Sequence, residues 1–450
     1  MKKGLIIFSI ILALLASLIM QKVEIAESNF FPVPGPDLPR ILIKNDGSIE
    51  PTTAPIERTG NIYKLTDNIV LFSIEIQRDN IVLDGAGYMI QGNASGLPGY
   101  DVDGNVGVII TGRNKVNITR LKFEQSDTAI RILSSSHVNV VKNSFFNNLQ
   151  RGITVQDSTH VLIEGNDFLD IYGDNPSISL GGSENTIRNN ILAGSIRGIE
   201  IEGQSNLIAD NRIESLLPII MDKADHNIIS RNNITGPASS PNLPDQNYKG
   251  NEGIALFSRC SNNLIFGNNI SGFVNQAIRT VFSCSNNTFY GNYFADNEFA
   301  IALQSGAANN TFYGNTFTVD SCKIQIGDEV EGIFWDNGTI GNYWGNYNGT
   351  DSDGDGIGDS PYIINALIWD TDIDGFVSYV SGQDNYPLMA PYDIEHEKII
   401  LSPRLPITTL LVLVTGIGLG IFAYLVKKRS NSKWIRDFCQ SLLFSYYLFH

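Results

Sequence analysis

The stretch Ile130-Arg-Ile132, Val138-Asn-Val140, Asn143-Ser-Phe145 contains three short apolar alternations, and the next 23 residues repeat it as Ile153-Thr-Val155, Val161-Leu-Ile163, Asn166-Asp-Phe168. Alternation with a period of two predicts short strands that bury one face. Turns separate the strands, and no segment is long enough for a helix. Stacked coils of three such strands would bury each inward side chain against its counterpart one coil away. The pattern therefore predicts an all-β parallel β-helix.

An anchor asparagine, followed two residues later by Ile, Phe or Trp, marks each coil. The anchors are Asn143, Asn166, Asn189, Asn211, Asn232, Asn268, Asn292, Asn315 and Asn342. Most steps between them are 21–24 residues, which is typical of a solenoid with about 11–12 coils. Stacked at about 4.8 Å, the asparagine amides could bond along the axis. Asparagine also tolerates the left-handed geometry of a coil corner.

The remaining sequence divides around this repeat. Residues 23–55 are rich in proline and predict an extended lead-in, and residues 56–327 predict the coils. Residues 236–253 account for a step of 36 residues and form an insertion, which is either a binding element or passive. Residues 328–391 are acidic and aromatic, and we expect them to cap the open end of the stack.

The two ends of the chain are apolar. Residues 1–22 read as a signal peptide or an uncleaved signal anchor. After a linker at 392–406, residues 407–426 form a mostly apolar, uncharged run. This run of 20 residues is long enough for a transmembrane helix. Lys427, Lys428 and Arg429 follow, so residues 427–450 should form a cytoplasmic tail. We expect a single-pass protein of the cell membrane, after signal cleavage, with its β-helix outside the cytoplasm.

Composition narrows the possible partners. The 450 residues carry a net charge of −16, which argues against nucleic-acid binding because that requires a basic face. Only four cysteines occur, too few for a disulfide scaffold. Cys260 and Cys284 each lie eight residues before an anchor on neighbouring coils, and they could form a disulfide or remain two buried thiols.

The run Asp351-Ser-Asp353-Gly-Asp355-Gly-Ile357-Gly-Asp359 predicts a calcium site. Carboxylates at positions 1, 3 and 5 followed by a glycine match the front half of a calcium loop, with the Ile357 carbonyl and Asp359 as further ligands. Position 12 is Tyr362, so the loop is not an EF-hand. It is similar to the Asp-rich calcium repeats of thrombospondin type 3. Asp370, Asp372 and Asp374 repeat the spacing and could form a second calcium site.

Two further groups of residues could carry chemistry. His137 and His160 lie six residues before their anchors, so they should stack on adjacent coils, either as a copper or zinc site or as polar corner residues. Other coils hold Ser183, Ser205 or Asn262 in this column. Glu200, Glu202 and Asp222 form an acidic group that could supply the two carboxylates of glycoside hydrolysis, although acids on the surface of an acidic protein are also common.

Eight Asn-x-Ser/Thr sequons lie in the predicted outer segment and could be glycosylated. They are Asn93, Asn117, Asn233, Asn269, Asn286, Asn309, Asn337 and Asn348.

The repeats Asn287-Thr-Phe-Tyr-Gly-Asn292 and Asn310-Thr-Phe-Tyr-Gly-Asn315 resemble those of the NosD-type right-handed parallel β-helix family. The opening Asp79-Asn-Ile-Val-Leu-Asp-Gly-Ala-Gly-Tyr88 and the closing Gly341-Asn-Tyr-Trp-Gly-Asn-Tyr347 and Asp384-Asn-Tyr-Pro-Leu388 resemble its archaeal surface-protein form. The resemblance implies a right-handed β-helix over residues 56–390. It also implies kinship with carbohydrate-binding and sugar-hydrolysing domains and with a periplasmic accessory protein of copper-enzyme maturation.

Three functions remain open at this point. The first is a surface protein that binds or organises polysaccharide or other cell-envelope components, because long polar ladders suit a polymer lying along the axis. The second is a polysaccharide lyase, hydrolase or epimerase that uses Glu200, Glu202 or Asp222. The third is copper handling through His137 and His160, although the sequence shows no Met/His cluster.

Overall fold

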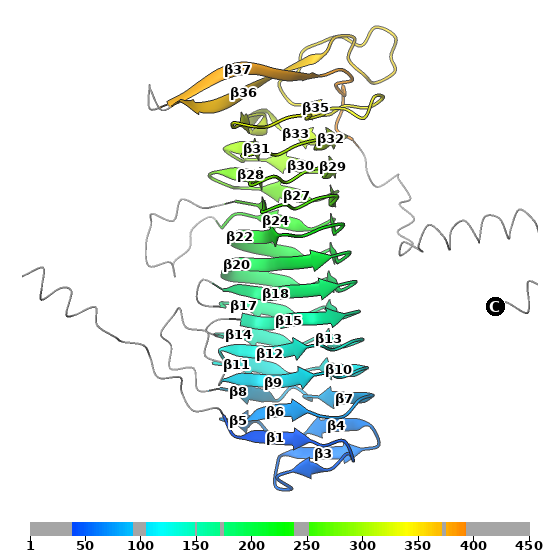
Figure 1. Cartoon of the computed structure of the whole chain (residues 1–450), viewed down its shortest axis with the longest axis vertical. Helices are drawn as coiled ribbons and strands as arrows, with labels where there is room; N and C mark the ends of the chain where they lie inside the picture. Colours follow the sequence, from blue (N-terminus) through cyan, green and yellow to red (C-terminus); the bar gives the residue numbers. More distant parts are fainter. Residues whose placement is uncertain are drawn as a thin grey trace, which may run out of the picture. The chain divides into compact units, whose positions relative to one another are not determined.

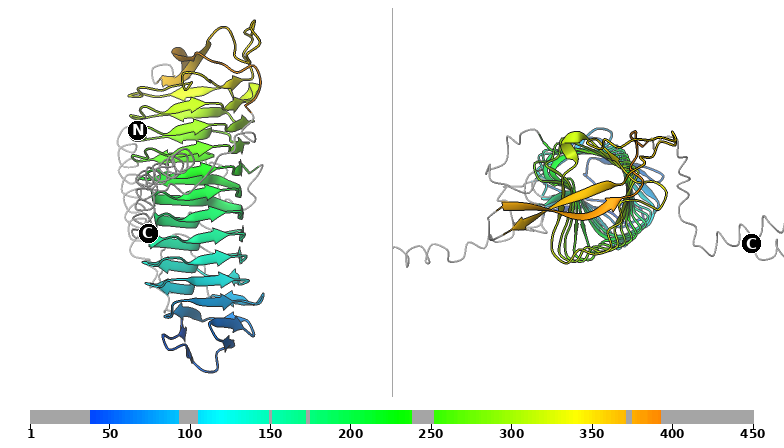
Figure 2. Two further views of the ribbon diagram at one scale, coloured as in Figure 1. Left: turned by 90° about the vertical axis from the view of Figure 1, so that its right-hand side faces the viewer. Right: turned by 90° about the horizontal axis from the view of Figure 1, so that it is seen from above.

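The computed structural model describes residues 38–92, 105–148, 151–171, 175–237, 252–370 and 375–392. These residues form a stack of coils in which short strands repeat at the same places around the axis (Figures 1 and 2). Neighbouring coils pair in parallel on three faces, which we call the first, second and third sheets. The predicted all-β parallel β-helix is confirmed.

The first sheet contains β1 (Arg40–Ile43), β6 (Ser73–Ile76), β9 (Val106–Thr111), β12 (Thr128–Leu133), β15 (Arg151–Thr159), β18 (Pro176–Ser183), β20 (Ile191–Gln204), β22 (Arg212–Asp222), β25 (Ile254–Phe257), β28 (Gln276–Thr280), β31 (Phe299–Leu303), β34 (Ile324–Ile326) and β36 (Tyr362–Asp370). The second sheet contains β4 (Ile62–Leu65), β7 (Ile81–Asp84), β10 (Val116–Thr119), β13 (Asn139–Val141), β16 (Leu162–Glu164), β19 (Thr186–Arg188), β21 (Leu207–Ala209), β23 (Ile228–Ser230), β26 (Leu264–Phe266), β29 (Thr288–Tyr290) and β32 (Thr311–Tyr313), with β3 (Ile56–Thr59) as an antiparallel partner of β4.

The third sheet contains β5 (Ile69–Val70), β8 (Met89–Gln91), β11 (Lys122–Glu124), β14 (Ser144–Phe146), β17 (Asp167–Leu169), the first residues of β20 and β22, β24 (Asn233–Thr235), β27 (Asn269–Ser271), β30 (Tyr293–Ala295), β33 (Thr316–Phe317) and β35 (Tyr343–Trp344). The remaining elements are β2 (Ile49–Glu50), the short 3-10 helix η1 (Val319–Ser321) and β37 (Gly375–Asp384). The second sheet has 12 strands, of which β3 only pairs antiparallel with β4 and adds no coil. The other 11 strands mark successive coils in the described residues.

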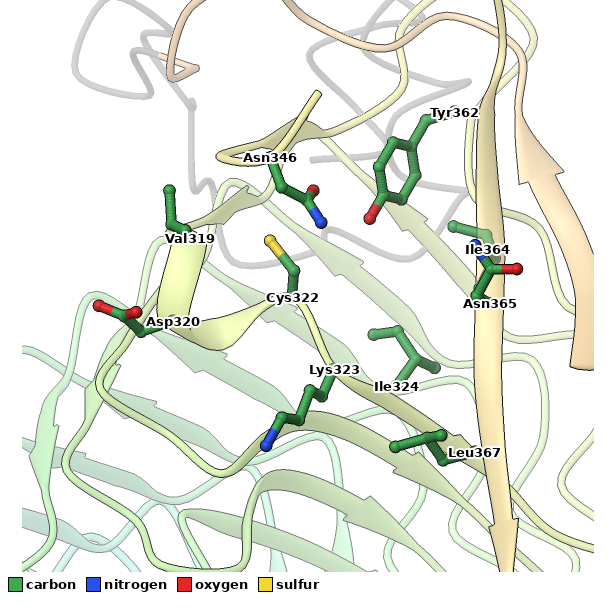
Figure 3. Close-up of a pocket in the computed structure, with 10 residues that line it drawn as sticks. All are labelled: Val319, Asp320, Cys322, Lys323, Ile324, Asn346, Tyr362, Ile364, Asn365 and Leu367. Atoms are coloured by element: carbon green, nitrogen blue, oxygen red, sulfur yellow. The ribbon is translucent and has the colours of Figure 1, made fainter. Parts of the chain in front are cut away.

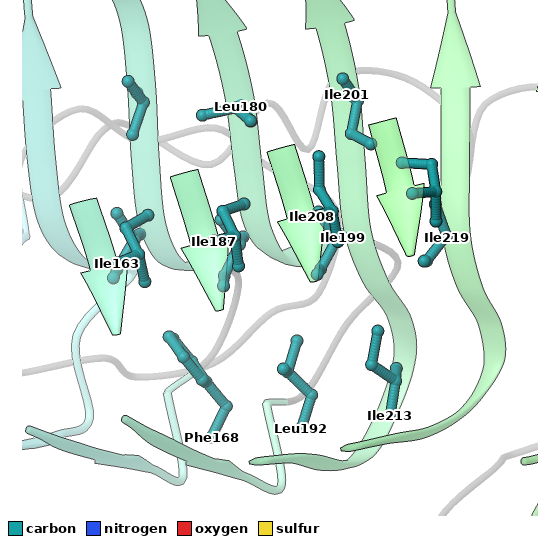
Figure 4. Packing of buried hydrophobic residues seen from close by; sticks show 14 of the residues in the cluster. Ile163, Phe168, Leu180, Ile187, Leu192, Ile199, Ile201, Ile208, Ile213 and Ile219 are labelled. Atoms are coloured by element: carbon teal, nitrogen blue, oxygen red, sulfur yellow. The ribbon is translucent and has the colours of Figure 1, made fainter. Parts of the chain in front are cut away.

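The interior consists of rows of apolar side chains, one row for each inward position (Figure 4). Ile163, Ile187 and Ile208 follow one another along the second sheet, and each is fully buried. Aromatic side chains form a similar row on the third sheet, where the rings of Phe123, Phe145 and Phe168 stack with centroids 5.0 and 4.4 Å apart. The alternation in the sequence thus places one side chain of each pair in the core.

A ladder of buried asparagines runs along the corner between the second and third sheets. In each step, the backbone N–H of one asparagine donates to the side-chain oxygen of the next over 2.9–3.1 Å, from Asn143 through Asn342. The predicted ladder exists, but Asn190 and not Asn189 is its member in that coil. Asn190 is buried, whereas Asn189 is exposed and has a φ of +55°. The left-handed residue precedes the ladder asparagine.

A second ladder, which the sequence analysis did not identify, runs along the corner between the first and second sheets. Its members are Asn185, Asn206, Asn227, Asn263, Asn287 and Asn310, linked over 2.8–3.0 Å. Each lies five residues before a member of the first ladder, and this fixed spacing was the available sequence signal. The ladders satisfy buried backbone groups at two of the three corners.

The stack begins earlier than residue 56, within the predicted lead-in. Strand β1 pairs in parallel with β6, and Ile41 and Ile43 point into the core. Its Arg-Ile-Leu-Ile alternation therefore outweighs the surrounding prolines. At the other end, β35 and β36 continue the third and first sheets beyond residue 328, and the β36–β37 ribbon lies across the end of the stack (Figure 2).

Several predicted segments fall outside the described residues. They are the signal segment 1–22, most of the insertion 236–253, Asn93, Asp372, Asp374 and the side chain of Asp370, nearly all of the linker 392–406, the transmembrane helix 407–426 and the tail 427–450. Within the part of the chain that is described, no helix has the length and apolar character needed to cross a bilayer.

Candidate functional site

The outer face of the first sheet carries one column of side chains that lie in register from coil to coil. Strand registers place Arg131, Thr154, Ser179 and Glu200 opposite one another on successive coils. Ile220 follows Glu200, and the column continues through Ala255, Arg279, Ala302 and Gln325. A polar strip of four coils therefore ends where the apolar Ile220 begins.

Glu200, Glu202 and Asp222 come together at the upper end of this strip. Glu200 and Glu202 lie two residues apart on β20 and face the same way, and Asp222 is the next outward residue on β22 beside Glu202. Burial raises the pKa of Glu200, and the neighbouring Glu202 and Asp222 add to this, whereas Arg197 and Arg151 oppose it. Asp222 Oδ2 lies 3.1 Å from Lys223 Nζ, and its buried Oδ1 has no partner among the described groups.

Small residues form the strip below these acids. Thr154 and Ser179 precede Glu200 in one column, and Gly181 lies beside Glu202 in the next column. The Thr154 hydroxyl is buried and has no hydrogen-bond partner among the described groups. The backbone is close-packed at the adjoining corner, where a Cβ on Gly203 would collide with the Gly182 carbonyl oxygen. A ligand lying on this strip would thus meet hydroxyls, backbone and three carboxylates.

Arg279 anchors one end of the predicted insertion to the same sheet. Its Nη1 lies 2.6 Å from Glu252 Oε1, and Glu252 is only 5% exposed. Glu252 lies two residues before β25, and Gly236, at the other end of the insertion, follows β24. The insertion therefore leaves the third sheet after β24 and returns to the first sheet before β25. The sequence does not predict this ion pair, because its partners lie 27 residues apart and Glu252 belongs to the insertion, which does not follow the coil repeat.

His137 and His160 stack as predicted, with ring centroids 4.8 Å apart and planes within 6°. The column continues to Glu184 rather than to the predicted Ser183, because the anchor of that coil is Asn190, and His160 Nε2 lies 2.9 Å from Glu184 Oε2. Stacked rings aim their nitrogens in parallel rather than at a common point. Among the described residues, only Asp351, Asp353 and Asp355 form a group of three or more His, Cys, Asp or Glu that could hold one ion. Among the described residues, His137 and His160 are therefore not joined by a third His, Cys, Asp or Glu ligand, and a copper or zinc site there stays a prediction.

Cys260 and Cys284 are fully buried free thiols on neighbouring coils. Cys260 Sγ contacts the Phe257 carbonyl oxygen at 2.8 Å, and Cys284 Sγ contacts that of Val281 at 3.1 Å. Their mutual hydrogen bond, together with burial, raises the pKa of the Cys260 thiol. Of the two alternatives, the structure has the pair of buried thiols, which behave as small core side chains.

The acidic loop brings three of its predicted ligands together. One carboxylate oxygen from each of Asp351, Asp353 and Asp355 lies within 4.8 Å of the others. Asp351 also accepts hydrogen bonds from the backbone N–H groups of Gly354 and Gly356, which shapes the turn. Asp359 is not part of this group, because its Oδ2 accepts hydrogen bonds from Thr350 and Ser352.

The backbone of Ile357 is oriented by a contact outside the acidic loop. Ile357 forms an antiparallel bridge with Leu388 in which Gly358 N–H donates to Pro387 and Met389 N–H donates to Gly356. In such a bridge, the polar groups of the central residue point away from the partner strand. The Ile357 N–H accordingly donates to Asp355 Oδ1 at 2.8 Å. The oxygen-only group suits a hard cation such as calcium.

Asp384 ends the first asparagine ladder. The Asn342 N–H donates to Asp384 Oδ2 at 2.7 Å, in place of the next asparagine, and Trp344 Nε1 donates to the same oxygen at 2.9 Å. Asp384 is fully buried, which raises its pKa to about 6, although the bonds from Trp344, Asn342 and Tyr386 oppose the shift. A Cβ on Gly341 would overlap the Asp384 carboxylate. The two closing motifs of the sequence thus meet at one buried group.

The described sequon asparagines lie on the outside of the stack. Asn117 is half-buried, and the others are exposed, namely Asn233, Asn269, Asn286, Asn309, Asn337 and Asn348. Their glycosylation stays a prediction.

Comparison with known proteins confirms the resemblance to the NosD-type right-handed β-helix family. Residues 176–342 match the family model described as "Right handed beta helix region", and residues 72–249 match "Periplasmic copper-binding protein (NosD)". A search of curated proteins finds no significant match.

Several solved structures are similar to parts of this chain. The tailspike protein of E. coli bacteriophage HK620, in complex with a pentasaccharide, is 14% identical, with 58% of this chain and 53% of the tailspike covered and a TM-score of 0.39. The alginate lyase from Paenibacillus sp. str. FPU-7 is 15% identical, with 52% and 92% covered and a TM-score of 0.37. PfbA, a surface adhesin of Streptococcus pneumoniae, is 10% identical, with 71% and 89% covered and a TM-score of 0.44. The chain thus spans about half the length of the tailspike.

Proposed function

We propose that this protein binds polysaccharide along the outer face of its first sheet. The observation that supports this most directly is the polar strip from Arg131 to Glu200, which offers one side chain per coil at the strand spacing of about 4.8 Å. A polymer lying along the axis would meet one polar side chain at each of these four coils. Hydroxyl and carboxylate groups accept hydrogen bonds from sugar hydroxyls, and the Arg131 guanidinium donates to them.

The acidic group at the end of the strip makes catalysis a second candidate. Glycoside hydrolysis uses one carboxylic acid that stays protonated and one carboxylate that is ionised. Glu200, whose pKa is raised by burial, is suited to the acid. Glu202 or Asp222 would then act as the base or nucleophile. Reaction at this position would shorten a bound polymer, whereas a binding protein would leave its length unchanged.

We further propose that calcium stiffens the cap and that the β-helix is held at the outer surface of a membrane. Support for calcium comes from the three converging carboxylates of Asp351, Asp353 and Asp355. Support for the membrane comes only from the apolar run 407–426 and the basic residues behind it.

A polymer panel tests binding and catalysis together. The full chain, in detergent and calcium, is incubated with acidic and neutral polysaccharides, and polymer size and co-elution are followed by chromatography. Co-elution without shortening supports binding, and shortening supports catalysis. A panel in which no polymer co-elutes or shortens contradicts the proposal.

A pair of triple variants locates the activity. Glu200→Gln, Glu202→Gln and Asp222→Asn together remove three carboxylates from the strip and should abolish shortening or weaken co-elution. The control replaces three exposed carboxylates elsewhere, Asp67→Asn, Asp167→Asn and Asp296→Asn, with the same change of charge. Equal effects of the two triples would mean that overall charge, rather than this strip, governs the interaction.

A further inference from the structure

A cavity of about 490 Å³ opens beside the cap, at the upper end of the first sheet (Figure 3). It lies between η1, β34 and the first residues of β36, and it is separate from the acidic group on β20 and β22. Its volume falls within the range of pockets that hold small molecules, about 300–1,000 Å³.

The cavity exists because β36 extends beyond its neighbour. β34 begins at Ile324, which pairs with Ala366, so residues 362–365 of β36 have no strand beside them on that side. On its other side, β36 pairs with β37 from Tyr362 onward, with a register shift between Ile364 and Asn365. The open edge of β36 therefore faces η1 and Cys322 across the space.

Uncharged polar groups converge on this space. The Tyr362 hydroxyl interacts with the Asn346 side chain, and both are directed into the cavity in Figure 3. Asn365 also lines the cavity, from the same strand as Tyr362, and is exposed. Amides and a phenol each offer both donors and acceptors, which is the pattern that matches a ligand carrying several hydroxyls.

The floor is apolar, and the aromatic wall is held in place. Ile324 and Ile364 are buried beneath the space. The Tyr362 ring stacks on Trp344 at 4.4 Å, and Trp344 is itself fixed by its bond to Asp384. An apolar floor beside a fixed aromatic wall suits the C–H face of a saturated ring.

The charges at the rim do not favour an anion. Asp320 and Lys323 contribute −1 and +1, which cancel, and Lys323 Nζ lies 2.6 Å from Glu298 Oε1 outside the cavity. The cationic group is therefore already neutralised, and the remaining carboxylate would repel a negatively charged ligand.

We propose that this cavity is a second binding site that takes one uncharged, hydroxyl-rich ring, such as a neutral sugar unit. The Tyr362 hydroxyl and the Asn346 and Asn365 amides bond its hydroxyls, and Ile324 and Ile364 contact its ring. The proposal goes beyond the polymer strip and does not depend on it.

Cys322 provides a direct readout because it lines the cavity and is half-buried, whereas Cys260 and Cys284 are fully buried. The full chain is treated with iodoacetamide at alkaline pH, since burial raises the pKa of the Cys322 thiol. Glucose, galactose, mannose and N-acetylglucosamine are compared with glucuronic and galacturonic acids. Mass spectrometry follows alkylation of the peptide that contains Cys322. At least one neutral sugar should slow this reaction, and the uronic acids should do so less.

Two variants and a control test the contacts. Tyr362→Phe keeps the ring on Trp344 and removes one hydrogen bond, so the sugar concentration for half-protection should rise about fivefold. Asn365→Ala, on the exposed wall, should weaken protection without affecting the stacked rings. Tyr293→Phe, at an exposed tyrosine on β30, should leave protection unchanged.

Three results would overturn the proposal. They are no protection by any neutral sugar, equal protection by uronic acids, or protection unaffected by both Tyr362→Phe and Asn365→Ala. In the triple variant at Glu200, Glu202 and Asp222, neutral sugars should slow the alkylation of Cys322 as much as they do in the wild type. Failure of polymer binding and failure of this site are thus measured separately.

Discussion

Replacing Asp384 by asparagine should remove a pH dependence of stability that this one buried group creates. Its pKa is about 6 in the folded protein, against an ordinary value of 3.8. Because the folded state holds the proton more tightly, the stability associated with the protonated group is fully present below about pH 4. It is lost as the pH rises through 6.

The magnitude follows from the difference between the two pKa values. A pKa difference of about two, at about 1.4 kcal/mol for each pKa unit, corresponds to about 3 kcal/mol over the whole titration. About 2 kcal/mol of this falls between pH 4 and pH 6.5, because the unfolded carboxyl is already partly ionised at pH 4. Asp384 has no exposed surface, so solvent does not screen this contribution. Asparagine retains an oxygen for the Asn342 N–H and the Trp344 indole, as in the ladder below, but it has no proton to lose in this range.

Urea unfolding followed by tryptophan fluorescence at several pH values measures the effect in the full chain. The difference in unfolding free energy, wild type minus Asp384→Asn, cancels the titration of the other carboxyl groups. This difference should fall by about 2 kcal/mol between pH 4 and pH 6.5. A flat difference would refute the reasoning. A difference that rises with pH would show that the donors on Asn342, Trp344 and Tyr386 outweigh burial.

Two further predictions concern the ladder and the acidic loop. Asn190→Ala should lower the unfolding free energy by about 2–4 kcal/mol, because it leaves the Asn166 N–H and buried carbonyls without partners. Asn189→Ala, at the exposed neighbour, should lower it by less than about 1 kcal/mol. Similar losses in the two variants, measured by urea unfolding, would contradict the assignment of the ladder. Asp353→Ala should lower the melting temperature in calcium but hardly at all in chelator, because without the ion this carboxylate accepts only one long, exposed hydrogen bond, from the Asp355 N–H at 3.3 Å. An equal drop under both conditions, measured by thermal unfolding, would remove the calcium assignment.

The structure of the coils follows most directly from the sequence. Alternating apolar pairs such as Ile153-Thr-Val155 and the repeated asparagines determine a parallel β-helix, because every coil faces the same packing problem and repeats the same solution. The outward column from Arg131 to Glu200 and the stacking of His137 on His160 follow from the same period. Where two asparagines adjoin, as at 189 and 190, the period alone does not say which one is buried.

Contacts outside the repeat were decided by the tertiary structure. Asp384 replaces an asparagine at the end of the ladder, 42 residues after Asn342, and no sequence period connects them. The cavity beside Tyr362 exists because β34 starts four residues later in register than β36, which follows from how the cap closes the stack. The Glu252–Arg279 pair likewise depends on where the insertion returns to the first sheet. Periodic contacts can be predicted from a sequence because each coil constrains the next, whereas the contacts of a cap occur once and depend on the path of the chain through space.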